Sequence, residues 1–343
     1  MLHFAARSKK PATRRKPSIR FEGTSKVSNV RPQQIAALSA TANQSTRSPF
    51  GEHDEIGMLN LITASSRRAI LARADAGTVY DLSMDLFPGM PSWIYGGDLS
   101  FQIWLSHTPH GRLVDERMTS GRAAHETISD SGDTISMYTH CGTHIDTLNH
   151  YGYSGEIWNG FNERDHMGSR HWNVCGADKH PPIIARAVLI DVARAHGVNV
   201  LPDSYGIGEQ DIREALTRQR VTVGLGDVVL LRTGRIRMWP DAGRFMLNEP
   251  GLNREGAEYL ARQGAIIVGA DNVALDQLPS PNPDNWLPVH TYLLAEAGVP
   301  IIEVLNLEEL AAAKIYESAF VGAATRIRGA TGAPIRPFVM PLL

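Results

Sequence analysis

The chain has 343 residues, of which 43% are hydrophobic, and its 34 Lys and Arg residues nearly balance its 36 Asp and Glu residues. This composition is too apolar and too evenly charged for a disordered protein, and the chain is long enough to bury a large core. Two cysteines exclude a disulfide framework and a cysteine-based zinc module, and no apolar run reaches the roughly 18 residues of a membrane-spanning helix. We therefore expect a cytoplasmic globular protein without a membrane partner.

The charge balance conceals a basic N-terminal segment, residues 1–48. It holds ten Lys and Arg and a single acid, Glu22, so the remaining residues carry 24 basic and 35 acidic side chains. The pattern predicts a disordered extension before one acidic folded domain over residues 49–343. The pair Arg14-Arg15 is no secretion signal, because no apolar segment follows it. A solvated extension is the preferred interpretation, a transit peptide stays open, and no nucleic-acid partner is expected.

The first part of the folded domain alternates helix, strand and loop signals. Residues 64–76 have helical apolar spacing and end before Gly77. Residues 78–84, 101–106 and 134–139 favour strands. The polar, glycine-containing segment between the last two, residues 107–133, indicates a long loop or a small excursion from the domain.

The second part of the domain alternates apolar strands with amphipathic helices. Strands are expected at residues 187–192, 227–232, 265–269 and 300–305, and helices at 209–219, at 254–263 after the N-cap Asn253, and at 290–297. Such alternation predicts a single α/β domain built around a mixed sheet. The chain lacks a P-loop, a dinucleotide-binding glycine fingerprint and a nucleophile elbow, which disfavours NTPases, common dehydrogenases and α/β-type serine hydrolases.

Histidines are the most informative residues of the sequence. Ten of the 13 histidines lie between His107 and His196, and the segment T-H-C-G-T-H-I-D-T-L-N-H, residues 139–150, contains three of them. His140, His144, Asp146 and His150 follow one another at spacings of four, two and four. Even spacings place side chains on one face of an extended chain. Two imidazoles and a carboxylate from this face form a three-ligand set for a divalent metal ion.

His140 lies too far from Asp146 for a straight strand, so the chain is expected to bend at Cys141-Gly142. A glycine permits the bend, and we expect its missing Cβ to leave the metal side open. His150 is then the candidate general acid/base. Cys141 has the opposite register and is interpreted as a packing residue, as is Cys175.

These residues resemble a known signature. His140 to His150 is similar to the H-x-G-T-H-x-D-x-x-x-H motif of the cyclase superfamily, which includes bacterial kynurenine formamidase and isatin hydrolase. Further segments that resemble family blocks are Tyr80–Ser83, Gly89–Pro91, Gly226–Gly234, Gly269–Asp276 and Arg328–Pro334. Together the likeness covers roughly Glu52 to Pro337.

The resemblance implies the family's swivelling β/β/α fold and a divalent ion, Zn²⁺ or Mn²⁺, with one or two per subunit. It assigns His140, His144 and Asp146 to the metal and His150 to proton transfer. His290 and Glu303 resemble the distal residues that complete a second metal position. Trp93 resembles an aromatic residue that lines the substrate pocket. The resemblance also implies a homo-oligomer, a dimer or tetramer.

Three departures favour a longer branch of the family over kynurenine formamidase itself. Thr147-Leu148 replaces a small residue and a proline, Ala274 replaces a common serine, and residues 52–76 form an added preamble. The expected activity is hydrolysis of a C–N bond in a small amide, formamide or lactam by metal-activated water, with a histidine as acid/base. A lactone or ester hydrolase, or a metal-dependent lyase or cyclase, would use the same site and stays open.

Overall fold

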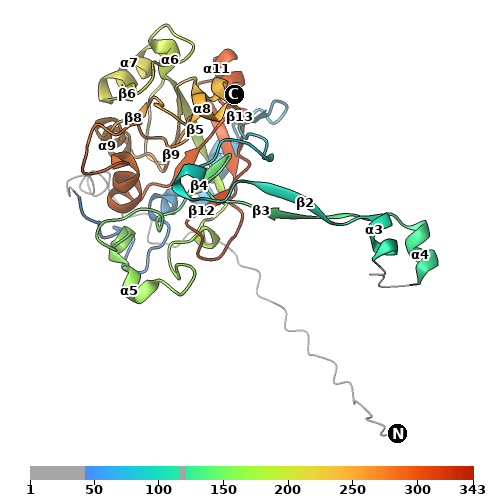
Figure 1. The fold of residues 1–343 in the computed structure, drawn as a ribbon. Coiled ribbons are helices and arrows are strands. Elements are labelled where there is room, and N and C mark those ends of the chain that lie inside the picture. The colour runs from blue at the N-terminus through green and yellow to red at the C-terminus, as the bar shows by residue number, and fades with distance from the viewer. Residues whose placement is uncertain (1–42, 116–120) are drawn as a thin grey trace.

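A nine-stranded mixed sheet forms the centre of the molecule in the computed structural model, which describes residues 43–115 and 121–343 (Figure 1). Its strand order is β1-β13-β11-β5-β7-β9-β10-β4-β12. The strands are β1 (Tyr80–Asp81), β4 (His144–Asp146), β5 (Ile183–Asp191), β7 (Val228–Arg232), β9 (Ile267–Ala270), β10 (Ile301–Glu303), β11 (Glu317–Gly322), β12 (Gly332–Pro334) and β13 (Phe338–Pro341). The predicted α/β domain around a mixed sheet is confirmed.

Four parallel strands, β5, β7, β9 and β10, make up the middle of this sheet. Their apolar runs are buried on both faces, as expected where helices cover a parallel sheet. The next strand, β4, pairs antiparallel with β10 on one side and with β12 on the other. The histidine-rich segment therefore lies in the sheet, between strands from the C-terminal third of the chain.

Two amphipathic helices have the predicted bounds. Helix α7 covers Glu209–Gln219, and α9 covers Arg254–Gln263. Asn253 is the N-cap of α9, and its side chain accepts a hydrogen bond from Gly256 N. The other α-helices among the described residues are α2 (Ala64–Leu71), α3 (Pro109–Val114), α4 (Arg122–Thr127), α5 (Glu163–His166), α6 (Val192–Ala195), α8 (Ala242–Phe245), α10 (Pro288–His290) and α11 (Glu308–Ala312), and a π-helix over Thr291–Ala297 continues α10.

Other predicted elements are shorter than expected. Helix α2 ends at Leu71, because the chain then turns so that Ala74 bridges Leu342 in the C-terminal segment. The strand expected at 78–84 is reduced to β1, and the strand expected at 134–139 ends at Ser136. Residues beyond Ser136 leave the strand to approach the site, which sequence periodicity does not reveal.

A long hairpin extends from the body. Strands β2 (Gln102–His107) and β3 (Gly132–Ser136) pair with each other alone and carry α3 and α4 at their far end (Figure 1). This unit, residues 102–136, is called the arm below. It is the excursion expected from the polar segment 107–133. A third, two-stranded sheet joins β6 (Gly206–Ile207) and β8 (Gly251–Leu252).

The chain N-terminal to the domain is described only from Asn43. Arg47 Nη1 donates to Asn159 O at 2.6 Å, and Ser48 N donates to Asn159 Oδ1 at 2.9 Å. Most of the basic extension expected at 1–48, namely residues 1–42, lies outside the described residues. Within the described part of the chain, no helix combines the length and apolarity needed to cross a bilayer.

Candidate metal centre

The chain bends at Gly142 and then enters β4. Gly142 has φ +61°, in the left-handed region that favours glycine, so the predicted bend is confirmed. The expectation for its missing Cβ is wrong, because a Cβ there would collide with Leu86 and not with the site. In β4, His144 and Asp146 share one face, while Ile145 joins the hydrophobic core on the other.

Strand pairing places Glu303 beside His144. The two residues are register partners in the antiparallel pair β4–β10, and His144 Nε2 lies 3.2 Å from Glu303 Oε2 and 3.3 Å from Asp146 Oδ1. His290, at the end of α10, approaches from another side. Its Nε2 lies 3.3 Å from Asp146 Oδ2 and 3.2 Å from Glu303 Oε1. The structure thus brings the predicted distal pair His290 and Glu303 to the histidine-rich segment.

The far nitrogen of each imidazole is held by a hydrogen bond. His144 Nδ1 donates to Gly142 O at 2.8 Å, and His290 Nδ1 donates to Asp276 Oδ2 at 2.7 Å. Asp276 also accepts from the backbone N–H groups of Val289 and His290, so its carboxylate acts as an acceptor. In a neutral imidazole the Nε2 atoms then carry lone pairs directed at the carboxylates of Asp146 and Glu303.

Lone pairs facing carboxylates repel unless a proton or a metal ion lies between them. Three atoms here are buried without a hydrogen-bond partner: His144 Nε2, Asp146 Oδ2 and Glu303 Oε1. Burial alone lowers the pKa of His144, but the charges of Asp146 and Glu303 outweigh it and raise this pKa to about 10. The carboxylates of Asp146 and Glu303 are stabilised by a positive charge between them and the imidazoles. A divalent cation supplies that charge and is typically bound by such nitrogen and oxygen donors.

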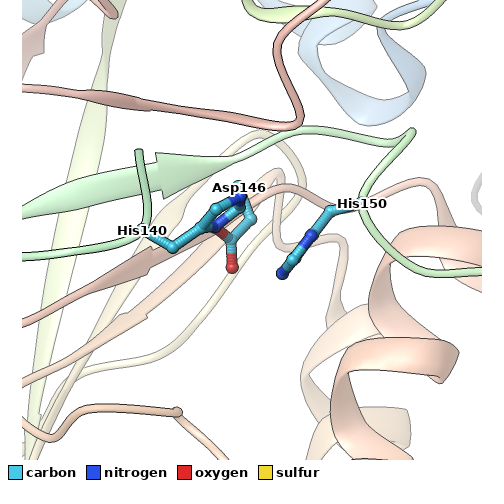
Figure 2. A group of neighbouring side chains, drawn as sticks. All are labelled: His140, Asp146 and His150. Atoms are coloured by element: carbon cyan, nitrogen blue, oxygen red, sulfur yellow. The ribbon is translucent and has the colours of Figure 1, made fainter. Parts of the chain in front are cut away.

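His140 and His150 form a second group around Asp146. His140 Nδ1 lies 2.6 Å from Asp146 Oδ1, and its Nε2 lies 2.9 Å from the Thr331 hydroxyl. His150 stacks on His140 with ring centroids 3.9 Å apart, and Figure 2 shows it approaching from the segment after β4. Two sets of three side chains each bring one ligand atom per residue to within 4.8 Å of the others. The first set is His140, Asp146 and His150, and the second is His144, Asp146 and Glu303. Asp146 therefore belongs to both groups.

His150 differs electrostatically from His144. Its burial, together with the positive charge of His140, lowers its pKa well below the ordinary value. The imidazole is therefore neutral near pH 7, although it lies beside carboxylates. A neutral imidazole at the edge of a metal-ligand cluster can accept a proton, as general base catalysis requires.

A cavity of about 380 Å³ opens onto these residues. Its lining is formed by Trp93, Gly96, Asp98, Tyr138, His140, His150, Tyr151, Ala274, Trp286, Leu287, His290 and Glu303. Trp93 thus lies in the cavity wall. Tyr151 lies with its ring centroid 5.0 Å from that of His290 and 5.9 Å from that of Trp286. The volume is that of a site for a small molecule.

Sequence reasoning missed three residues of the site: Asp276, Thr331 and Tyr151. Asp276 and Thr331 lie in segments that resemble family blocks, which was the available signal, while Tyr151 follows His150 directly. The two cysteines are buried and free, as predicted for packing residues. Cys141 Sγ donates to Tyr138 O, and burial raises its pKa to about 11, so the thiol stays protonated.

Three solved structures illustrate the similarity of the fold. One, described as a novel cyclase, is 26% identical with a TM-score of 0.75, over 87% of this chain and 99% of that chain. Isatin hydrolase A from Ralstonia solanacearum is 23% identical with a TM-score of 0.57, over 77% and 92%. Isatin hydrolase A from Labrenzia aggregata is 20% identical with a TM-score of 0.58, over 78% and 94%. At 23% and 20% identity, the two isatin hydrolases are similar to this chain in fold alone.

A comparison with curated proteins gives no match. The Cyclase family model, in contrast, matches residues 80–277, which is more than half of the chain and includes the segment from His140 to His150. The chain also has a fold similar to that of the novel cyclase, and the signature residues lie together in one cluster. This chain therefore belongs to the cyclase family.

Proposed function

We propose that the protein is a metal-dependent hydrolase that cleaves a C–N bond in a small amide, formamide or lactam. The observation that carries this proposal is the set of buried, unpartnered atoms around Asp146, which a bound divalent cation would satisfy. The family membership and the isatin hydrolases with the same fold support hydrolysis of a small carbonyl compound.

The proposed ligands are His140, His144, Asp146, His290 and Glu303. Proposed ligand atoms lie near both carboxylate oxygens of Asp146, so the site would hold one or two ions, with Zn²⁺ or Mn²⁺ suited to imidazole and carboxylate ligands. When bound there, such an ion polarises a substrate carbonyl and makes water more acidic.

The chain's own groups complete the chemistry. His150, neutral at pH 7, accepts a proton from water as water adds to the carbonyl carbon, and returns it to the leaving nitrogen. Trp93, Tyr151 and Trp286 enclose the reacting groups on the cavity side. The net reaction adds one water across the C–N bond, and no covalent intermediate with the protein is needed.

The test is a substrate screen with product masses. Purified protein loaded with Zn²⁺ or Mn²⁺ is offered formanilides, cyclic imides, isatin-like lactams and lactones. Hydrolysis of an amide or lactam gives products whose summed mass exceeds the substrate by one water. Products without added water would contradict hydrolysis and identify a lyase or cyclase, and turnover of lactones alone would contradict C–N specificity.

A further inference from the structure

The cavity wall is rich in aromatic side chains and, apart from the histidines of the candidate metal centre, contains no cationic side chain among the residues that the structure describes. Its described lining includes Trp93, Tyr138, Tyr151 and Trp286 and contains no Lys or Arg. Its acidic lining residues are Glu303, which belongs to the candidate metal centre, and Asp98. A negatively charged substituent of a substrate would therefore find no countercharge in the wall, beyond the metal centre itself.

Asp98 is partly buried and lies just before the arm. Among the residues that the structure describes, its carboxylate makes no hydrogen bond or ion pair. Asp98 shares the cavity lining with Trp93 and Tyr138, so an acid without an ion-pair partner among the described residues belongs to an aromatic wall.

A cation satisfies both features of this wall. Its charge pairs with the carboxylate, and the faces of Trp and Tyr rings attract cations through their quadrupoles, most strongly in partly desolvated sites. The folded domain is acidic as a whole, which favours the approach of cations.

We propose that Asp98 and the aromatic rings that line the same cavity form a subsite for a positively charged group, an alkylammonium, on the substrate. This inference rests on the proposed function, because it concerns a substrate of the same cavity. The scissile carbonyl would lie at the metal centre and the ammonium group at Asp98, so that Asp98 sets specificity without taking part in bond cleavage.

A binding experiment tests the subsite without relying on turnover. The metal-loaded protein is titrated calorimetrically with benzyltrimethylammonium, which cannot ligate a metal, and with neutral benzyl alcohol. We expect the cation to bind on the order of tenfold more tightly than the alcohol. In Asp98→Asn this preference should disappear, and in the control Asp133→Asn, an exposed acid on the arm, it should remain.

Equal affinity of the two probes for the wild-type protein would overturn the subsite, as would a preference that Asp98→Asn retains. A second comparison uses 4-(aminomethyl)formanilide and 4-(hydroxymethyl)formanilide as substrates. A higher KM for the ammonium substrate in Asp98→Asn, with kcat unchanged, is expected. If neither formanilide is cleaved while the cation still binds selectively, the failure concerns the proposed function and the subsite stands.

Discussion

Asp146 connects the two groups of side chains from which the function is inferred. One of its carboxylate oxygens lies near His140 and His144, and the other near His290. The carboxylate is buried, and the nearby imidazoles, His140 foremost, hold its pKa well below the ordinary range despite that burial. An ionised carboxylate with imidazoles on both sides is suited to hold one or two cations.

The role of His150 predicts a separation between metal binding and turnover. In His150→Ala the ligand set around Asp146 remains, so metal content should match that of the wild type. The loss of the proton acceptor should lower kcat by about 10²–10⁴-fold on a substrate found in the screen. Metal analysis and steady-state kinetics measure the two quantities, with the exposed His53→Ala as a control. Full activity of His150→Ala would refute the assignment.

His180 predicts a pH dependence of stability away from the site. It is buried, its two ring nitrogens lack hydrogen-bond partners, and burial lowers its pKa from 6.5 to about 4. Because the unfolded chain takes up this proton near pH 6.5 and the folded chain does not, stability is lost as the pH falls from 6.5 to 4. At about 1.4 kcal/mol per pKa unit, the loss approaches about 3 kcal/mol.

His180→Leu should remove this contribution without leaving an unpaired polar group. Urea unfolding at pH 7 and at pH 4.5 measures the effect: the free energy of unfolding should fall more for the wild type than for the variant. An identical fall for both proteins would show that His180 does not resist protonation.

At the scale of elements, the π-helix after α10 and the strand pairs around β4 position the site. Asp276 reaches across to His290 from the segment after β9, accepting three hydrogen bonds from Val289 and His290. A ligating histidine whose other nitrogen is fixed in this way has a set tautomer and ring orientation.

Asp276→Asn should therefore weaken metal binding without removing a ligand. We expect a loss of about 10–100-fold in metal affinity, the usual effect of removing the partner of a ligating histidine. Competition with a chromogenic chelator measures it, and Asp284→Asn, an exposed acid in the following loop, is the matched control. An unchanged affinity in Asp276→Asn would mean that His290 does not depend on this hydrogen bond.

Local patterns predicted the elements that are governed by local physics. The helices α7 and α9 follow from amphipathic spacing and, for α9, an Asn cap, and the shared face of His144 and Asp146 follows from strand periodicity. The contact of Glu303 with His144 depends on the register of β10 against β4. These strands are far apart in the sequence, and no local pattern predicts their register. The family resemblance supplied Glu303 and His290, whereas Asp276 needed the structure.

At the scale of the whole molecule, the arm exposes apolar side chains that no other part of the described chain covers. Among its described residues, six apolar side chains are between 45% and 65% exposed: Ile103, Trp104, Leu105, Val114, Ile128 and Ile135. A two-stranded hairpin is marginal in water without a covering surface. Both ends of the arm lead into residues of the cavity wall, Asp98 and Tyr138.

We therefore predict that the arm packs against a second copy of the chain and that the protein is a dimer or tetramer. Light scattering after size exclusion measures the mass. A combined Trp104→Ser, Val114→Ser and Ile128→Ser variant should shift it toward the monomer, since it removes apolar surface that an interface would bury. A monomeric wild-type protein at micromolar concentration would contradict this prediction.

The most direct test of the account is elemental analysis of the purified protein and its Asp146→Ala variant. After loading with Zn²⁺ or Mn²⁺ and removal of excess metal, the wild-type protein should retain one or two ions per chain. Asp146→Ala should retain none, because the ligand histidines His140, His144 and His290 lose their shared carboxylate. A folded wild-type protein without bound metal, or an Asp146→Ala variant with the full wild-type content, would contradict a metal centre built on Asp146.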